Sequence, residues 1–332
     1  MESASAIKTR VARWERFFLE ITNRCNFDCT FCPMCDSTRP KRDMNPEQAR
    51  SIIDQLQALG FGGLIYFHVL GEPLLHPAAL ELADYAADAG MRPILFSNGG
   101  AFTDEMIARV FASKAHAVTI SMQTINRQCY EAFRKTPFDW DTYLARIQRA
   151  VAMADDVEIN QGQCRLSVQM GVRKPDPDNP GDEYFAEYDS IEQVKESISA
   201  IFSQAKGTDL EGVFSELKRA DPAGLSPTRI SERLTLSVKP IGNWRRLWRE
   251  TPIAFGKCPF IGREMAVLSN GMVTFCHLDY DGRTAIGDIE ERSLADILGA
   301  SDLSRMLRDY EAARSAPETC RYCRGLKEDT TS

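Results

Sequence analysis

Short apolar runs that alternate with helical patterns constrain the fold of this chain more than any other feature. Six runs of strand type occupy residues 17–22, 64–69, 92–97, 117–122, 165–172 and 233–239. Such alternation predicts a parallel sheet with right-handed crossovers. Six units are too few for a closed eight-stranded barrel, so we expect an α/β fold with a partial, TIM-like (β/α)6 barrel. Its chemistry would lie at the C-terminal ends of the strands.

The first predicted helix follows the first strand and has well-marked ends. Asn45 is expected to cap it, and Pro46 suits its first turn. Gln48 would complete a capping box with Asn45, and Gly60 would end the helix.

The pattern changes after residue 245. Two β-type runs flank Asn270-Gly271, which is a strong hairpin signal, and a helical pattern covers residues 293–313. The insertion at 174–231 is expected to form surface loops, and its acidic, proline-rich start, which leaves the end of a strand, is a candidate for part of a lid. We divide the chain into an N-terminal extension (1–16), a barrel (17–245, with that loop or insertion region), a small α+β domain (246–325) and a disordered tail (326–332).

Composition excludes several classes of function. The net charge of −7 argues against nucleic acid as a partner, because binding a phosphate backbone needs a basic face. The sequence shows no secretion signal and no apolar run of about 18 residues, so we expect a cytoplasmic protein without a membrane span. Ten cysteines in such a chain indicate metal ligands or catalytic thiols rather than disulfides.

Three of these cysteines, Cys25, Cys29 and Cys32, have the spacing C-x3-C-x2-C. A tight loop of thiolates suits an iron–sulfur cluster, for which cysteine sulfur is the usual ligand. A [4Fe–4S] cube held by three cysteines leaves one iron open to another molecule. Structural zinc is the alternative, because Cys35 would supply the fourth ligand of a closed zinc site.

The neighbouring residues favour the cluster. The stretch NRCNFDCTFCP resembles the signature of the radical S-adenosylmethionine (radical SAM) enzymes. In that family the aromatic residue before the third cysteine, here Phe31, contacts the adenine of SAM. The triplet Gly71, Glu72 and Pro73 is similar to the family's Gly-Glu-Pro motif, which holds the methionine amino group.

Two further strand ends extend the resemblance. Ser97 and Asn98 lie in FSNGG, which is similar to the family's Thr-Asn-Gly element with serine in place of threonine. Ser121 and Gln123 follow the next strand, where a polar residue contacts the ribose in the family. The resemblance covers residues 17 to about 240 and implies SAM, a SAM-binding [4Fe–4S] cluster and a radical mechanism.

Four more cysteines follow the barrel: Cys258, Cys276, Cys320 and Cys323. Four thiolates also suit a closed zinc site, so their pattern alone leaves that alternative open. Behind a radical SAM barrel, the pattern resembles the twitch form of a SPASM-type extension, which holds an auxiliary [4Fe–4S] cluster. The chain lacks the further cysteines of a full SPASM domain, so we expect one auxiliary cluster.

Three cysteines are left over: Cys35, Cys129 and Cys164. A small buried hydrophobe is the default role of such a cysteine. Cys35 and Cys129 are nevertheless candidate hydrogen donors to a carbon radical, whereas Cys164 should lie at the opposite end of the barrel. Arg173, at the C-terminal end of a strand, is the candidate substrate contact. His68 flanks the Gly-Glu-Pro turn and would line the pocket.

Enzymes that this architecture resembles oxidise or epimerise carbon centres or modify peptides. Only 24 residues precede Cys25, too few for the leader-recognition domain of many peptide modifiers. We therefore expect a small-molecule substrate, such as a sugar, aminocyclitol or nucleoside intermediate of natural-product biosynthesis, and a one-electron reductant such as flavodoxin or ferredoxin. A peptide-modifying maturase and a non-enzymatic zinc protein are the alternatives.

Overall fold

The computed structural model describes residues 2–124, 126–161, 164–172, 191–205, 210–219, 228–240, 244, 247–248 and 250–324. Arg173, much of the predicted insertion and the predicted tail lie outside these ranges. Among the described residues, no helix is long and apolar enough to cross a bilayer.

The predicted series of parallel strands forms the centre of one sheet. Its members, each parallel to the next, are β1 (Arg16–Leu19), β3 (Leu64–Tyr66), β4 (Arg92–Ser97), β5 (Ala117–Ser121), β7 (Arg165–Val172) and β9 (Leu234–Pro240). The strands lie in chain order, as in a barrel wound in one direction. The prediction of a partial (β/α)6 barrel is confirmed. The short β8 (Thr228–Arg229) pairs antiparallel with β9 at the edge of the sheet.

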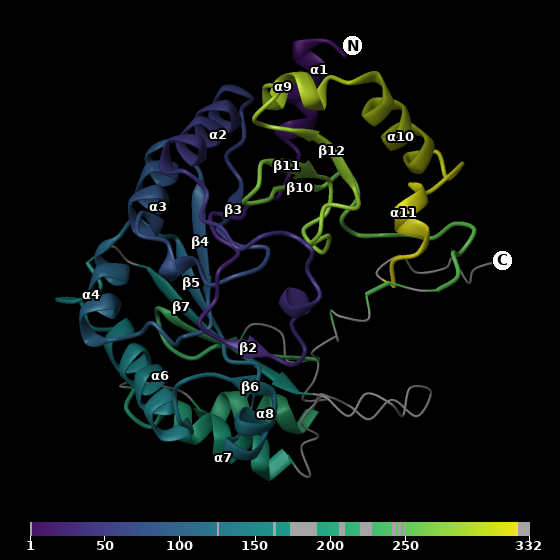
Figure 1. Cartoon of the computed structure of the whole chain (residues 1–332). Coiled ribbons are helices and arrows are strands. Elements are labelled where there is room, and N and C mark those ends of the chain that lie inside the picture. The colour runs from purple at the N-terminus through teal and green to yellow at the C-terminus, as the bar shows by residue number, and fades with distance from the viewer. Residues whose placement is uncertain are drawn as a thin grey trace.

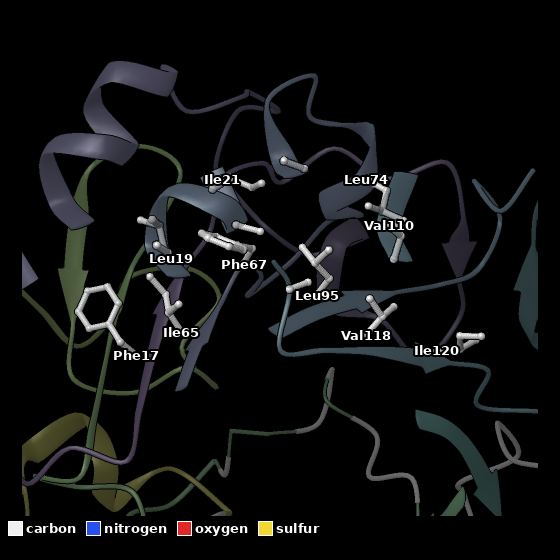
Figure 2. Close-up of a cluster of buried hydrophobic side chains, with 14 of the residues drawn as sticks. Phe17, Leu19, Ile21, Ile65, Phe67, Leu74, Leu95, Val110, Val118 and Ile120 are labelled. Carbon is white, nitrogen blue, oxygen red and sulfur yellow. The ribbon is translucent and has the colours of Figure 1, made fainter. Parts of the chain in front are cut away.

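Helices cover the outer face of this sheet (Figure 1). They include α2 (Pro46–Ala58), α3 (Ala79–Asp88), α4 (Asp104–Ala112), α6 (Trp140–Ala154), α7 (Ile191–Phe202) and α8 (Leu210–Arg219). Every second residue of the strands points towards the helices. Phe17, Leu19, Ile65, Leu95 and Val118 are fully buried and lie close together in the core in Figure 2. Each such side chain stabilises the fold by about 1.5–3 kcal/mol.

The ends of α2 follow local sequence, with one exception. The Asn45 side chain accepts a hydrogen bond of 2.8 Å from the Glu47 amide, and Pro46 opens the helix. Gly60, with φ +82°, follows its last turn. Gln48 does not complete a capping box, because its amide reaches Glu290 in the C-terminal segment, 3.3 Å away.

The C-terminal segment continues the same sheet. β10 (Glu264–Val267) pairs parallel with β1, and β11 (Met272–Thr274) forms the predicted hairpin with it, followed by β12 (Ala285–Asp288). The predicted helix over 293–313 is divided into α9 (Leu294–Leu298) and α10 (Ser301–Glu311), because Gly299 caps the first part. The chain then forms α11 (Glu318–Arg321), and Figure 1 shows α9 beside the N-terminal α1 (Ala4–Val11).

A buried ion pair joins this C-terminal segment to the loop after β1. Glu20 and Arg39 form two hydrogen bonds, of 2.5 and 2.8 Å. The Glu20 carboxylate also accepts the backbone amides of Leu70 (2.9 Å) and Ser269 (2.8 Å), and Arg39 donates to the carbonyl of Tyr280 (2.8 Å). Because all these partners are satisfied, the loop, the approach to the Gly-Glu-Pro turn and the hairpin are held in one arrangement.

Candidate functional site

The three thiols of the C-x3-C-x2-C loop lie together directly after β1. The pKa of Cys25 is raised to about 11 and that of Cys32 to about 12, mainly by burial, and the charges of the neighbouring thiols contribute to both increases. Burial also raises the pKa of Cys29. Without a bound cation these thiols are protonated at neutral pH, so the loop is suited to a metal that displaces the protons.

A short ribbon with a buried cation fixes this loop. β2 (Asp28–Cys29) pairs antiparallel with β6 (Arg134–Lys135), so that Cys29 lies opposite Arg134. The helix before this ribbon, α5 (Arg127–Phe133), ends directly at Arg134. The Arg134 side chain is buried over the ring of Phe27, at 4.8 Å, and its charge lowers the pKa of Cys29. Its Nε is buried without a hydrogen-bond partner.

The Gly-Glu-Pro turn packs against the backbone of the cysteine loop. Gly71 has φ +85°, and a Cβ there would lie 2.5 Å from the carbonyl oxygen of Thr22. The Glu72 amide donates to the carbonyl of Arg24 at 2.7 Å. Pro73 then begins the short helix η2 (Pro73–Leu75). Only glycine allows this close approach, so the motif has a structural reason at its first position.

The Glu72 carboxyl is fully buried and points into the site. Burial raises its pKa to about 7, although hydrogen bonds from the Asn98 amide (2.6 Å), the Leu74 amide (3.2 Å) and the Ser97 hydroxyl lower it. The charge of Arg134 also lowers it. The carboxyl therefore changes charge near neutral pH, which suits it to a cationic ligand.

Asn98 connects the segments of the site. Its side-chain amide donates to Asn26 (2.8 Å) and to the sulfur of Cys25 (3.4 Å), and its carbonyl accepts a bond from Arg134 (3.3 Å). A buried acid, Glu72, and a buried cation, Arg134, thus both bond to Asn98. Opposite charges held so close fit the ammonium and carboxylate of an amino-acid group. Arg134 was not predictable from the sequence, because nothing in the local pattern marks it.

The remaining candidates for SAM contacts belong to the cysteine loop or to the end of β5. The Gln123 amide donates to the Ser121 hydroxyl at 2.6 Å, beyond the end of β5, and Gln123 has φ +55°. Phe31 is 8% exposed and belongs to the main hydrophobic core. A ligand could therefore contact at most one edge of the Phe31 ring.

The four C-terminal thiols form a second group. Burial raises the pKa values of Cys258, Cys276 and Cys320, and each of the three is raised further by at least one other thiol of the group. The backbone amide of Cys258 donates to the Tyr310 hydroxyl at 2.6 Å, which anchors this ligand to α10.

Sulfur spacing separates the two kinds of metal site. A tetrahedral zinc with Zn–S bonds of about 2.3 Å holds its thiolates about 3.8 Å apart. Among the described residues, one group has three ligand atoms within 4.8 Å of one another, and it is Glu264, Cys276 and His277. Neither cysteine set forms such a group, so both are spaced more widely than one zinc ion needs. The donor sets fit a larger, all-sulfur group.

The left-over cysteines have different surroundings. Cys35 is exposed and lines a cavity of about 360 Å³ together with Cys25, Lys41 and Lys135. Cys129, in the first turn of α5, is 6% exposed and belongs to the main core. Cys164 is buried immediately before β7, at the N-terminal end of the strand, as expected. Arg173 lies outside the described residues.

The inner face of the sheet has one polar half. On β5, β7 and β9 the outward residues are apolar, and the positions between them carry Thr119, Ser121, Ser167, Gln169, Thr235 and Ser237. In the ladder Thr119 lies opposite Ser167, and Ser167 opposite Thr235. Three adjacent strands therefore present hydroxyl and amide groups to the interior of the barrel, where a polar ligand would bind through hydrogen bonds.

The other half of the inner face is aromatic. Phe18 of β1 stacks on Tyr66 of β3 at 4.9 Å and on His277 at 4.3 Å. His68 stacks on Phe96 of β4 at 4.7 Å. Phe18 also belongs to a small cluster of buried apolar side chains with Val69 and Leu70. The aromatic half therefore offers a ligand mainly ring contacts, whereas the polar half offers hydrogen bonds.

Comparison with known proteins identifies two regions of the chain. Residues 19–160 match the radical SAM superfamily, and residues 258–324 match an iron–sulfur cluster-binding domain, SPASM. The first region implies SAM and a [4Fe–4S] cluster, and the second implies auxiliary iron–sulfur binding.

Individual relatives cover parts of the chain. An AdoMet-dependent heme synthase of Methanosarcina barkeri is 31% identical over 130 residues, 39% of this chain and 37% of that protein. An S-adenosyl-L-methionine-dependent 2-deoxy-scyllo-inosamine dehydrogenase of Niallia circulans is 35% identical over 95 residues, 27% of this chain and 37% of that protein. Both alignments thus span little more than a third of the relative's length.

The likeness to solved structures extends over the whole fold. The crystal structure of BtrN in complex with AdoMet and 2-DOIA matches with a TM-score of 0.53 and 16% identity, and the match covers 96% of each chain. At this identity the likeness concerns the fold alone.

Proposed function

Because this chain carries a radical SAM domain followed by a SPASM iron–sulfur domain, we propose that it is an enzyme that oxidises a small, polar, hydroxyl-bearing molecule by hydrogen-atom abstraction. The observation that carries the choice of substrate is the polar inner face of β5, β7 and β9. Hydroxyl and amide side chains on three adjacent strands suit a ring compound with several hydroxyl or amino groups.

In this proposal the cysteine loop holds the first cluster through Cys25, Cys29 and Cys32 and leaves one iron to SAM. Bound together, the cluster and SAM supply a 5′-deoxyadenosyl radical, which removes a hydrogen atom from the substrate. The protein's own part is to bind and orient SAM. Glu72 accepts the methionine ammonium, and Arg134, whose Nε has no partner, pairs with the carboxylate.

The other proposed contacts to SAM come from the cysteine loop and from the end of β5. In this proposal the edge of Phe31 borders the adenine, and Ser121 and Gln123, which bond to each other, would bond to the ribose hydroxyls. Asn98 contributes indirectly, because its amide bonds hold the cysteine loop against the Gly-Glu-Pro turn. Ser97 supports the Glu72 carboxyl in the same way.

The C-terminal cysteines, Cys258, Cys276, Cys320 and Cys323, would hold one auxiliary [4Fe–4S] cluster. Such a cluster offers a one-electron acceptor, which the oxidation of a substrate radical to a carbonyl requires. A reductant such as flavodoxin or ferredoxin would supply the electron that starts each cycle. Oxidation is preferred over epimerisation because the auxiliary cluster would accept the second electron. Cys35, which is exposed and lines the cavity beside Cys25, is the candidate hydrogen donor for the alternative, epimerisation.

The test uses anaerobically reconstituted, reduced protein with SAM in D2O. A panel of 2-deoxy-scyllo-inosamine, myo-inositol, glucosamine and adenosine is followed for 5′-deoxyadenosine and for product mass. We expect at least one compound to raise 5′-deoxyadenosine formation and to lose two hydrogens. Deuterium at a carbon without that loss would point to epimerisation. No response to any compound would contradict the proposed substrate class.

The polar face provides an internal control for the same assay. Thr235→Val removes an inward hydroxyl and is expected to slow product formation, whereas the matched outward change Leu236→Ile leaves the inner face intact. Equal effects of the two variants on product formation would show that the polar face does not bind the substrate.

A further inference from the structure

His68 has an unusual environment for a polar side chain. It lies two residues beyond the end of β3 and shares the inner face of the sheet with Tyr66 and Phe96. Its Nδ1 is buried and has no hydrogen-bond partner. His76 differs, because its Nε2 pairs with the carbonyl of Met44 at 2.9 Å.

Aromatic neighbours fix the orientation of this imidazole. Phe96 stacks on it at 4.7 Å with an angle of 24° between the ring planes. Phe18 and Tyr66 meet it edge-on, at 5.7 and 5.9 Å. A ring held on three sides by packing is presented to a ligand without loss of further side-chain freedom.

The same surroundings keep the ring neutral. The pKa of His68 is lowered to about 3, mainly by burial, and the nearby His277 contributes to this shift. A neutral imidazole carries one donor and one acceptor nitrogen, so it can bond to a hydroxyl group in either direction.

Packing alone gives no reason for a histidine here. A buried polar atom without a partner is unfavourable, and folded proteins rarely keep one without a bound group that satisfies it. A phenylalanine would make the same ring contacts with Phe18 and Phe96 and would leave nothing unpaired. The position also adjoins the Gly-Glu-Pro turn in the chain, because Glu72 follows four residues later, and the stacking partner Phe96 directly precedes Ser97.

We propose that His68 is a substrate-binding residue whose imidazole hydrogen-bonds a hydroxyl group of a polar ring compound in the barrel. The ring would bind this hydroxyl from the aromatic half of the inner face, while the polar half on β5, β7 and β9 binds the others. This inference rests on the proposed function and deepens it, because it assigns a residue to substrate recognition.

The first test observes the ring directly in the reconstituted, oxidised holoprotein with SAM bound. The chain has four histidines, so the ring nitrogens of ¹⁵N-histidine-labelled protein give few signals, and the spectrum of His68→Phe identifies those of His68. Addition of myo-inositol, or of glycerol as a simple polyol, should shift the His68 nitrogens and leave those of His116 in place. An unchanged His68 signal at saturating polyol would overturn the inference.

The second test compares variants in turnover of the panel compounds. His68→Phe should raise KM about tenfold or more, with SAM affinity and iron content unchanged, and His68→Gln should restore part of the loss. His116→Phe, a change just before β5 and outside the site, is the matched control. A KM equal to wild type in His68→Phe would refute the role of His68 alone. A shift of the His68 nitrogens without turnover of any panel compound would instead refute the proposed function.

Discussion

Replacement of Glu72 by glutamine should abolish the pH dependence of SAM binding. In the wild type the carboxyl must be ionised to hold the methionine ammonium, and burial raises its pKa to about 7. The ionised fraction is therefore about nine-tenths at pH 8 and about one-tenth at pH 6. Affinity should fall roughly tenfold between these values, a change of about 1.4 kcal/mol. SAM affinity is lost as the pH falls, because protonation of Glu72 removes the negative charge that binds the methionine ammonium.

The glutamine side chain keeps an acceptor oxygen but carries no charge. Loss of a hydrogen bond to a charged group is worth about 1.5–3 kcal/mol, so E72Q should bind SAM roughly 10- to 100-fold more weakly at pH 8. Its affinity should then change little down to pH 6.

The assay is equilibrium dialysis of SAM against reconstituted protein with oxidised clusters. Glu105→Gln, at an exposed position in the first turn of α4, controls for the general loss of a negative charge. Equal SAM affinity of the wild type at pH 6 and pH 8 would refute the assignment of Glu72 to the ammonium. So would a tenfold pH dependence that persists in E72Q.

Two further predictions concern stability and are measured by denaturant unfolding of the reconstituted protein. Gly71→Ala should lower the free energy of unfolding by more than about 2 kcal/mol, because φ is +85° and a Cβ would meet a carbonyl oxygen at 2.5 Å. The control Gly60→Ala has φ +82° but open space around the Cβ, so it should lower the free energy of unfolding by about 1 kcal/mol. Equal losses of stability in these two variants would show that the Gly-Glu-Pro turn does not pack closely against the cysteine loop. Arg39→Met should lower the free energy of unfolding by about 3–5 kcal/mol, because it leaves the buried Glu20 carboxylate without its cation. The control Arg314→Met, at an exposed ion pair, should lower it by less than about 1 kcal/mol. A small effect of Arg39→Met would mean that the ion pair does not hold the loop to the C-terminal segment.

The strands and the hairpin were predictable because their signals are local. A parallel strand such as β5 is apolar on its outward side, and Asn270-Gly271 specifies a tight turn whatever surrounds it. The order of the strands followed from chain order. Pairing of β10 with β1 joins residues far apart in the chain, and no local pattern encodes it.

The residues of the candidate site also divide into those that a local motif marks and those that only the fold brings together. Cysteine spacing and the Gly-Glu-Pro triplet are short motifs, so they were visible in the sequence. Arg134 was missed because β6 is two residues long and exists only through its pairing with β2. His68 was predicted to line the pocket from its place beside the Gly-Glu-Pro turn, whereas the missing partner of its Nδ1 is a property of packing that no local pattern shows. At Gln48 a local signal was present but did not hold: the predicted capping box does not form, because the Gln48 side chain bonds to the distant Glu290 instead.

We propose that the chain holds two separate [4Fe–4S] clusters, one on the loop after β1 and one on the C-terminal cysteines. The decisive measurement is the amount of iron and acid-labile sulfide per chain after anaerobic reconstitution. We expect about eight irons per chain in the wild type. We expect about four irons in the variant with Cys25, Cys29 and Cys32 changed to alanine, and about four in the variant with Cys320 and Cys323 changed to alanine. Tightly bound zinc with little iron, or loss of all iron from either variant, would contradict it.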